Sequence, residues 1–295
     1  AAAPGAPSAP PAAWDPLPPP TGAPPPAVPV AGEGSSSGRT HGASSYQAFG
    51  LSLRALRDEL KRAWDSHLAS GRATVDPLQT YQGRTRTRGG LDSTNGCTVI
   101  APLVGYRHLT WHDPHGQGRG LPSSHIEHVI DHDCPPLLAE IRHKYSLPPG
   151  AFAVPADVHD HLFDRKLLEE RFFGGVHGGN CLDEEHMGAM VETLEGFPRG
   201  HKAAVCFFFR EHVCAVLKLA CGAYEVVDSL PHAPYGMGVR IRCSGAEVLR
   251  ACLAWYCTSK FSQSQLDFLD ANPWDEATAE LDPRIFQGHV WHSGS

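Results

Sequence analysis

Three residues that lie far apart in the sequence carry side chains able to act together in catalysis. Cys97 opens the apolar run CTVIAPLVGYRHL, directly after the polar turn STNG. His212 begins a second apolar run, HVCAVLKL, and Asp228 closes a third, YEVVD. A thiolate can attack an acyl carbon, an imidazole can take up and return a proton, and a carboxylate can orient the imidazole. These residue types therefore predict nucleophilic catalysis with Cys97 as the nucleophile.

Cys97 has a second interpretation, because a cysteine at the start of an apolar helix is in most proteins a core thiol. A free thiol with a pKa of about 8.5 is only a few per cent ionised at neutral pH, so a reactive thiol needs surroundings that stabilise its thiolate form. The amide groups and dipole at a helix N-terminus favour the thiolate. The other eight cysteines, among them Cys134 and Cys257, lack such partners and are interpreted as core or surface thiols.

The elements around these residues follow from the hydrophobic periodicity. Leucines and a tryptophan at three- and four-residue steps predict a helix over 51–68, and Thr98 to Leu109 predicts a second, with Pro102 in its first turn. Further helices are expected within 123–147, 182–197 and 245–261, and strands at 203–210, 212–219 and 224–228. Helices followed by a small antiparallel sheet predict the α+β class, with a helical N-terminal part.

The predicted hairpin places His212 beside Asp228. His212 starts one strand, and Asp228 ends the next strand sixteen residues later. In an antiparallel pair joined by a short turn, these two positions lie at the same end of the sheet. The order Cys, His, Asp with this geometry is the one that papain-like thiol hydrolases use.

The hairpin and its surroundings resemble Josephin-type deubiquitinases and, more broadly, papain-like ubiquitin and ubiquitin-like proteases. The matching motifs are Glu211-His212, Lys218-Leu219 and Asp228-Ser229-Leu230, together with GGNCLDEEHMGAMVETL and the helix NGCTVIAPLVGYRHL. The likeness covers about half of the expected folded region. It implies a cysteine peptidase that cuts peptide or isopeptide bonds at a ubiquitin or ubiquitin-like C-terminus, with no cofactor.

The sequence departs from this pattern at the oxyanion hole and after the histidine. The family has a glutamine five residues before the nucleophile, where this chain has Asp92. Asn95 is the nearest amide donor, so Asn95 and the Cys97 amide are the expected oxyanion donors. Val213 replaces the aromatic residue that usually follows the catalytic histidine. Two alternatives stay open, a non-catalytic interaction module of the same fold and another thiol acyl-transfer enzyme.

Metal binding is the competing chemistry. His125, His128, His132 and Cys134 fall within ten residues, and on a regular helix the three histidines share one face. Imidazoles and a thiolate can hold zinc, but structural zinc sites usually draw ligands from two separate segments. A solvated helix face is the alternative, and DVHDH, residues 157–161, is a weaker candidate of the same kind. No metal site is therefore predicted.

The glycine-rich stretch FFGGVHGGN, residues 172–180, allows two interpretations. Its glycines could let the backbone of a substrate tail approach closely, with Asp183, Glu184 and Glu185 meeting basic residues of that tail. Alternatively, Gly178 and Gly179 form a turn, and the acidic residues occupy the first turn of the next helix.

Composition sets the remaining bounds on the 295-residue chain. Twelve of its 26 prolines lie within residues 1–29, which predicts a disordered tail and linker over 1–45 and one catalytic domain over 46–295. The tail is expected to be a spacer or a ligand for a proline-binding partner. The net charge of −7 argues against nucleic acid, and the sequence has no 18-residue apolar run for a membrane. Nine cysteines without a C-x-x-C pair favour a reducing, intracellular location, cytoplasmic or nuclear.

Overall fold

One antiparallel sheet organises the described part of the chain, which in the computed structural model comprises residues 52–114, 116 and 118–293. Its seven strands follow the order β1-β6-β5-β4-β3-β7-β2, and each neighbouring pair is antiparallel. The strands are β1 Ala73–Pro77, β2 Phe173–Asn180, β3 Ala203–Phe209, β4 His212–Lys218, β5 Tyr224–His232, β6 Met237–Cys243 and β7 Ile285–His292. The predicted tail, residues 1–45, lies outside the described residues.

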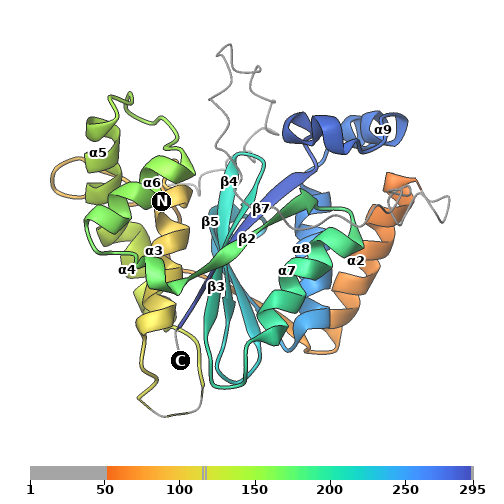
Figure 1. Ribbon diagram of the computed structural model, residues 1–295, viewed down its shortest axis with the longest axis horizontal. Coiled ribbons are helices and arrows are strands. Elements are labelled where there is room, and N and C mark those ends of the chain that lie inside the picture. The colour runs from red at the N-terminus through yellow and green to blue at the C-terminus, as the bar shows by residue number, and fades with distance from the viewer. Residues whose placement is uncertain (1–51, 115, 117, 294–295) are drawn as a thin grey trace, which may run out of the picture. The chain divides into compact units, whose positions relative to one another are not determined.

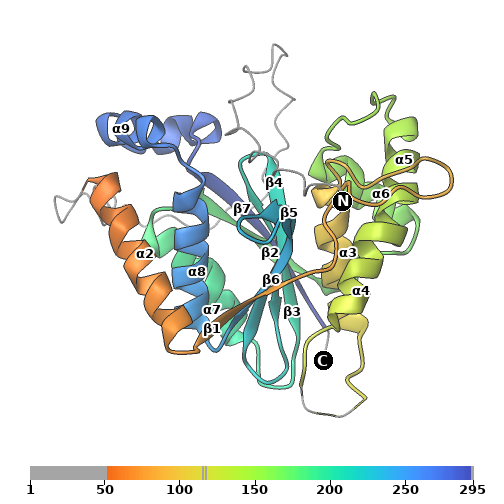
Figure 2. The same ribbon diagram turned by 180° about the vertical axis from the view of Figure 1, so that it is seen from behind.

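Helices cover both faces of this sheet (Figures 1 and 2). On one face lie α3 Cys97–Thr110, α4 Ser123–His128, α5 Cys134–Lys144 and α6 Pro155–Asp164, with a π-helix, Val129–Asp133, joining α4 to α5. On the other face lie α2 Leu53–Ala69, α7 Glu184–Gly196 and α8 Ala246–Ser259, and α9 Gln263–Ala271 follows α8. Two 3-10 helices, Glu170–Phe172 and Glu276–Leu281, complete the described helices. Among the described residues, no helix is long and apolar enough to span a bilayer.

The alternation of side chains along the central strands divides the interior into two cores. Val205 and Phe207 of β3 pack in the core under α2, α7 and α8, whereas Ala204 and Cys206 pack in the core under α3 to α6. Successive residues of a strand point to opposite faces, so a strand buried on both sides is apolar at nearly every position. This explains the continuous run AAVCFFF of β3.

The α+β class predicted from the sequence is confirmed, and the sheet is larger than the three predicted strands. Among the added strands, β6 follows β5 in a local hairpin, whereas β1, β2 and β7 pair with strands distant in sequence. The prediction of a turn at Gly178 and Gly179 is wrong, because both lie in β2 and pair with Gln287 and Phe286 of β7. Glycine has a low strand propensity, so this strand gives a weak signal.

A buried ion pair joins β5 to β6. Nη2 of Arg240 lies 2.6 Å from both carboxylate oxygens of Glu225. The two side chains are 4% and 2% exposed, so neither charge has water as an alternative partner. Gly120 fits against this pair, because a Cβ atom there would lie 2.5 Å from Oε2 of Glu225. The pair therefore fixes both the strands and the segment that follows α3.

We expect Glu225→Ala to lower the free energy of unfolding by about 3–5 kcal/mol, because it leaves a buried guanidinium without its counterion. Urea unfolding followed by circular dichroism measures the change. Arg72→Ala is the matched control, since it removes an ion pair with Glu247 whose partners are 45% and 71% exposed. Equal stability of the two variants would contradict a structural role for the buried pair.

Candidate active site

Cys97 is the first residue of α3, and the preceding turn sets its position. The Gly96 N–H donates to the Ser93 carbonyl at 2.9 Å, and Asn95 adopts a left-handed conformation with φ 56°. The Gly96 carbonyl then accepts from the N–H groups of Val99 and Ile100. N–H groups in the first turn of a helix lack carbonyl partners within the helix, so the Cys97 sulfur lies where negative charge is favoured.

Gly96 is required where the turn meets α5. A Cβ atom on Gly96 would lie 2.7 Å from the Cys134 sulfur and 2.8 Å from the Ser93 carbonyl. The backbone of the turn thus packs directly on a buried thiol of α5. This contact fixes the N-terminal end of α3 against the helical layer, and a larger residue would displace Cys97.

His212 and Asp228 meet across the central hairpin. Ala215 of β4 pairs with Val227 of β5, and continuing this register puts Asp228 opposite Cys214. His212 lies two residues before Cys214, so His212 and Asp228 are diagonal neighbours on one face of the sheet. His212 Nε2 lies 2.7 Å from Asp228 Oδ1.

The Cys97 thiol is close enough to His212 to raise the pKa of the imidazole. Because its Nε2 faces Asp228, Nδ1 is the ring nitrogen that remains for the thiol. Burial lowers the pKa of His212, but the charge and hydrogen bond of Asp228, with a smaller contribution from Cys97, raise it to about 9. The pKa of Asp228 lies well below its usual value, since the two imidazoles outweigh the opposite effect of burial. The site therefore favours a protonated imidazole between the thiol and a charged carboxylate.

Asp228 accepts hydrogen bonds from four donors. Oδ1 accepts from His212 Nε2 and from the Leu230 N–H, at 2.7 and 2.9 Å. Oδ2 accepts from His232 Nε2 and from the Tyr256 hydroxyl, at 2.7 and 2.8 Å. The Asp228 side chain has no exposed surface, so these donors replace water around the charge. Sequence reasoning missed His232 and Tyr256, although the motif Asp228-Ser-Leu-Pro-His232 contained a signal for the former.

Gln82 is a further buried polar residue that sequence reasoning missed. Its Oε1 accepts from the Ser229 hydroxyl at 2.9 Å, and its backbone N–H donates to the Ser229 carbonyl. The next residue, Gly83, donates its N–H to the Ser93 hydroxyl at 2.8 Å, in the turn before Cys97. Gln82 thus lies between the residue after Asp228 and the loop before Cys97. Because the side-chain amide is planar, the bond from Ser229 to Oε1 also fixes the direction of the Gln82 NH₂ group.

Asn95 has a hydrogen bond of its own. Its Nδ2 donates to the Gly150 carbonyl at 2.7 Å, in the loop between α5 and α6. Asp92 accepts from the Thr94 N–H at 2.9 Å, and Arg86 lies 3.7 Å from its carboxylate. The structure therefore brings Cys97, His212 and Asp228 together and ties the Asn95 amide to a neighbouring loop.

Most of the other cysteines are inaccessible. Seven of the eight are buried and Cys221 is exposed. Burial raises the pKa of the Cys134 thiol and raises that of Cys206 to about 12. Burial is also the chief reason that the pKa values of the Cys214 and Cys257 thiols are raised. These thiols are poor nucleophiles near neutral pH.

The histidines considered for zinc do not converge on a metal site. No group of three or more His, Cys, Asp or Glu side chains suited to a metal occurs among the described residues. The π-helix at 129–133 interrupts the regular spacing on which the shared face depended. His125 packs edge-on against Trp111 with ring centroids 4.7 Å apart, whereas Cys134 lies buried beneath Gly96.

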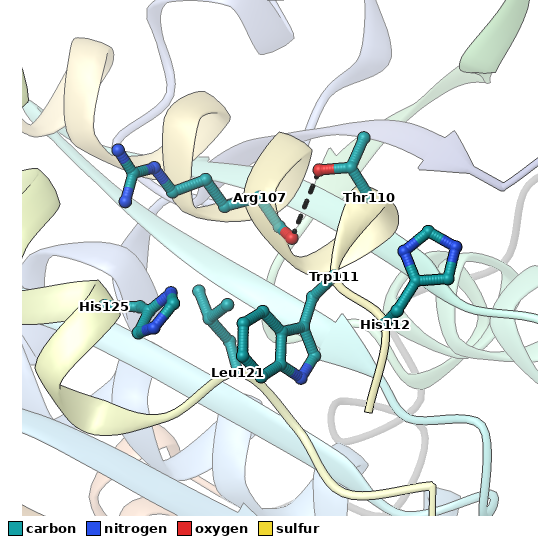
Figure 3. Close-up of a pocket in the computed structure, with 6 residues that line it drawn as sticks. All are labelled: Arg107, Thr110, Trp111, His112, Leu121 and His125. Carbon is teal, nitrogen blue, oxygen red and sulfur yellow. Dashed lines mark hydrogen bonds between the residues drawn. The ribbon is translucent and has the colours of Figure 1, made fainter. Parts of the chain in front are cut away.

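A cavity of about 420 Å³ opens at the opposite end of α3 from Cys97. Arg107, Thr110, Trp111, His112, Leu121 and His125 line it, and Figure 3 shows the Trp111 indole beside Leu121. Ten helical residues separate Arg107 from Cys97, which corresponds to about 15 Å along the helix axis. This cavity is therefore separate from the triad.

Comparison with known proteins gives limited information. No protein-family model and no curated protein sequence matches this chain. Among solved structures, it is similar to the ubiquitin-specific protease encoded by murine cytomegalovirus tegument protein M48, in complex with a ubiquitin-based suicide substrate. The match covers 75% of this chain and 87% of the viral one, with 9% sequence identity and a TM-score of 0.44. Values this low carry no conclusion about activity, and the Josephin resemblance stays a prediction from the hairpin motifs.

We expect Cys97 to react with iodoacetamide at pH 6 roughly tenfold or more faster than Cys221, because Cys97 lies at a helix N-terminus beside the imidazole of His212. Brief labelling followed by peptide mass spectrometry measures both rates. His212→Ala should abolish the difference and Asp228→Ala should reduce it. Equal rates for the two cysteines in the wild-type protein would remove the basis for Cys97 as the nucleophile.

Proposed function

We propose that this chain is a cysteine hydrolase that cleaves peptide or isopeptide bonds at a ubiquitin or ubiquitin-like C-terminus. The observation that carries the hydrolase assignment is the series of neighbouring side chains from Cys97 through His212 to the buried Asp228, in which His212 hydrogen-bonds to Asp228. The choice of ubiquitin rests on the resemblance of the hairpin motifs. A non-catalytic interaction module has no need of this series.

The mechanism follows from the protonation states that the site favours. The Cys97 thiolate attacks the carbonyl carbon of the scissile bond, and the carbonyl oxygen takes the negative charge. His212 then gives its proton to the leaving nitrogen, the C–N bond breaks, and a thioester remains on Cys97. Water attacks the thioester while His212 takes its proton, which releases the new carboxylic acid and regenerates the Cys97 thiolate beside the protonated His212.

Two donors are assigned to the oxyanion in this proposal. The Cys97 N–H lies at the start of α3, where the helix leaves its amides unpaired. The NH₂ group of Gln82 is the second donor, since Gln82 contacts Ser229 and its neighbour Gly83 contacts Ser93. We assign this role to Gln82 rather than Asn95, because the Asn95 amide already donates to Gly150.

A ubiquitin probe with a C-terminal propargylamide tests the substrate class. We expect wild-type protein to form a covalent adduct through Cys97, and Cys97→Ala to form none, as read from intact mass. If Cys97 is reactive toward iodoacetamide but not toward ubiquitin or ubiquitin-like probes, the protein is another thiol acyl-transfer enzyme. If Cys97 is inert to both reagents, the interaction-module alternative replaces the proposal.

We expect Gln82→Ala to lower kcat for a fluorogenic ubiquitin substrate by about 10²–10³, because it removes one oxyanion donor. Gln82→Glu should be at least as damaging, since a carboxylate there repels the oxyanion. Asn95→Ala is the comparison variant and should retain most of the wild-type turnover. A larger loss in Asn95→Ala than in Gln82→Ala would reverse the assignment.

A further inference from the structure

A second imidazole contacts the carboxylate that orients His212. His232 Nε2 lies 2.7 Å from Asp228 Oδ2, the same distance as His212 Nε2 from Oδ1. The two histidines differ in their other contacts, because His212 lies beside Cys97, whereas His232 lies 6.4 Å from the Tyr256 ring, centroid to centroid. His232 thus contacts Asp228 of the proposed triad but is not the base of that triad.

The local backbone is built to bring His232 to this position. Asp228 and His232 of β5 are four residues apart, whereas their β6 partners, Val239 and Met237, are two residues apart. In a regular strand, residue i+4 lies about 13 Å further along the chain. The extra residues form an irregularity in which the Leu230 N–H turns toward Asp228 Oδ1. The bulge therefore folds the strand back so that His232 reaches Asp228.

Donors to one carboxylate compete for its charge. Each N–H or O–H that binds Asp228 withdraws electron density, so a donor on Oδ2 weakens the attraction that Oδ1 exerts on the proton of His212. A general acid that holds its proton too strongly releases it poorly near neutral pH. A second donor on Asp228 therefore weakens the attraction between the carboxylate and the proton of His212.

We propose that His232 is a positioning residue of the triad, which fixes the Asp228 carboxylate through Oδ2 and weakens its hold on the proton of His212. This inference rests on the proposed triad and goes beyond it, because His232 contacts neither the thiol nor the substrate carbonyl. His232 is also the more accessible imidazole, with 24% of its side chain exposed against 13% for His212.

Several other groups act on the same network. The titratable and charged groups near Asp228 and His212 include Cys97 of α3, Cys214 of β4, Tyr256 of α8, and Lys260, whose Nζ lies 4.5 Å from the Tyr256 ring centroid. Tyr256 donates to the same Asp228 oxygen as His232. A variant that lacks His232 therefore keeps one of the two donors to Oδ2.

The test is an NMR titration of the His212 imidazole in histidine-labelled protein, with the signal assigned from a His212→Gln variant. His232→Ala should raise the His212 titration midpoint by about 0.5–1 pH unit, because it removes a competing donor. His232→Gln keeps an N–H donor and should leave the midpoint within a few tenths of a unit. Tyr256→Phe removes the other donor to Oδ2, so it should shift the midpoint in the same direction and covers the case in which His232→Ala does not fold.

An unchanged or lowered midpoint in His232→Ala, or in Tyr256→Phe if His232→Ala does not fold, would overturn the inference. Labelling of wild-type protein with the ubiquitin probe tests the proposed function independently of the His212 titration. A labelled protein with an unmoved midpoint refutes the role of His232 alone. A raised midpoint without ubiquitin labelling supports the role of His232 and refutes only the substrate class.

Discussion

The buried charge of Asp228 is the constraint on which the rest of the site depends. A carboxylate without solvent contact is stable only when its oxygens are fully hydrogen-bonded. Its four donors come from β4, from the bulge and end of β5, and from α8. Satisfying this one charge therefore fixes the hairpin, the bulge and the helix on the far face of the sheet relative to one another.

Cys97 is positioned by a different effect, the hydrophobic burial of α3. This helix is apolar on nearly every side, and eleven of its fourteen residues are buried. It packs on β3 and β4, where Gly105 allows close approach to Ala204, with 3.1 Å between a Cβ atom built on Gly105 and that of Ala204. Hydrophobic packing thus fixes the helix axis, and the turn ending in Gly96 determines where the first residue lies. The active site forms where this packing meets the hydrogen-bonded end of the hairpin.

The arrangement suits the proposed hydrolase better than an interaction module, for an energetic reason. Burying a carboxylate and an imidazole lowers stability unless the pair is well bonded, and apolar residues of similar size could occupy the same volume without that cost. A protein that only binds partners gains nothing from aligning such a pair with a thiol at a helix N-terminus. The geometry is explained when the imidazole must carry a proton between the thiol and a leaving group.

The sequence by itself determined the central elements and the candidate catalytic residues. Helix periodicity defined α2, α3, α7 and α8 to within a few residues, and the apolar runs marked β3 and β4 and most of β5. His212 and Asp228 could be paired from sequence because a hairpin is a local structure whose short turn fixes the register. Cys97 could be singled out because the sequence STNG is typical of a turn before a helix.

Tertiary structure decided the rest, because the remaining contacts join segments that no local pattern connects. Gln82 and Ser229 are 147 residues apart, and β1, β2 and β7 join the sheet through partners far along the chain. The bulge that returns His232 to Asp228 depends on the register of β6, and Tyr256 reaches Asp228 only because α8 packs on the opposite face of the sheet. A sequence pattern records the burial and spacing of neighbours along one element, whereas these contacts depend on how separate elements pack.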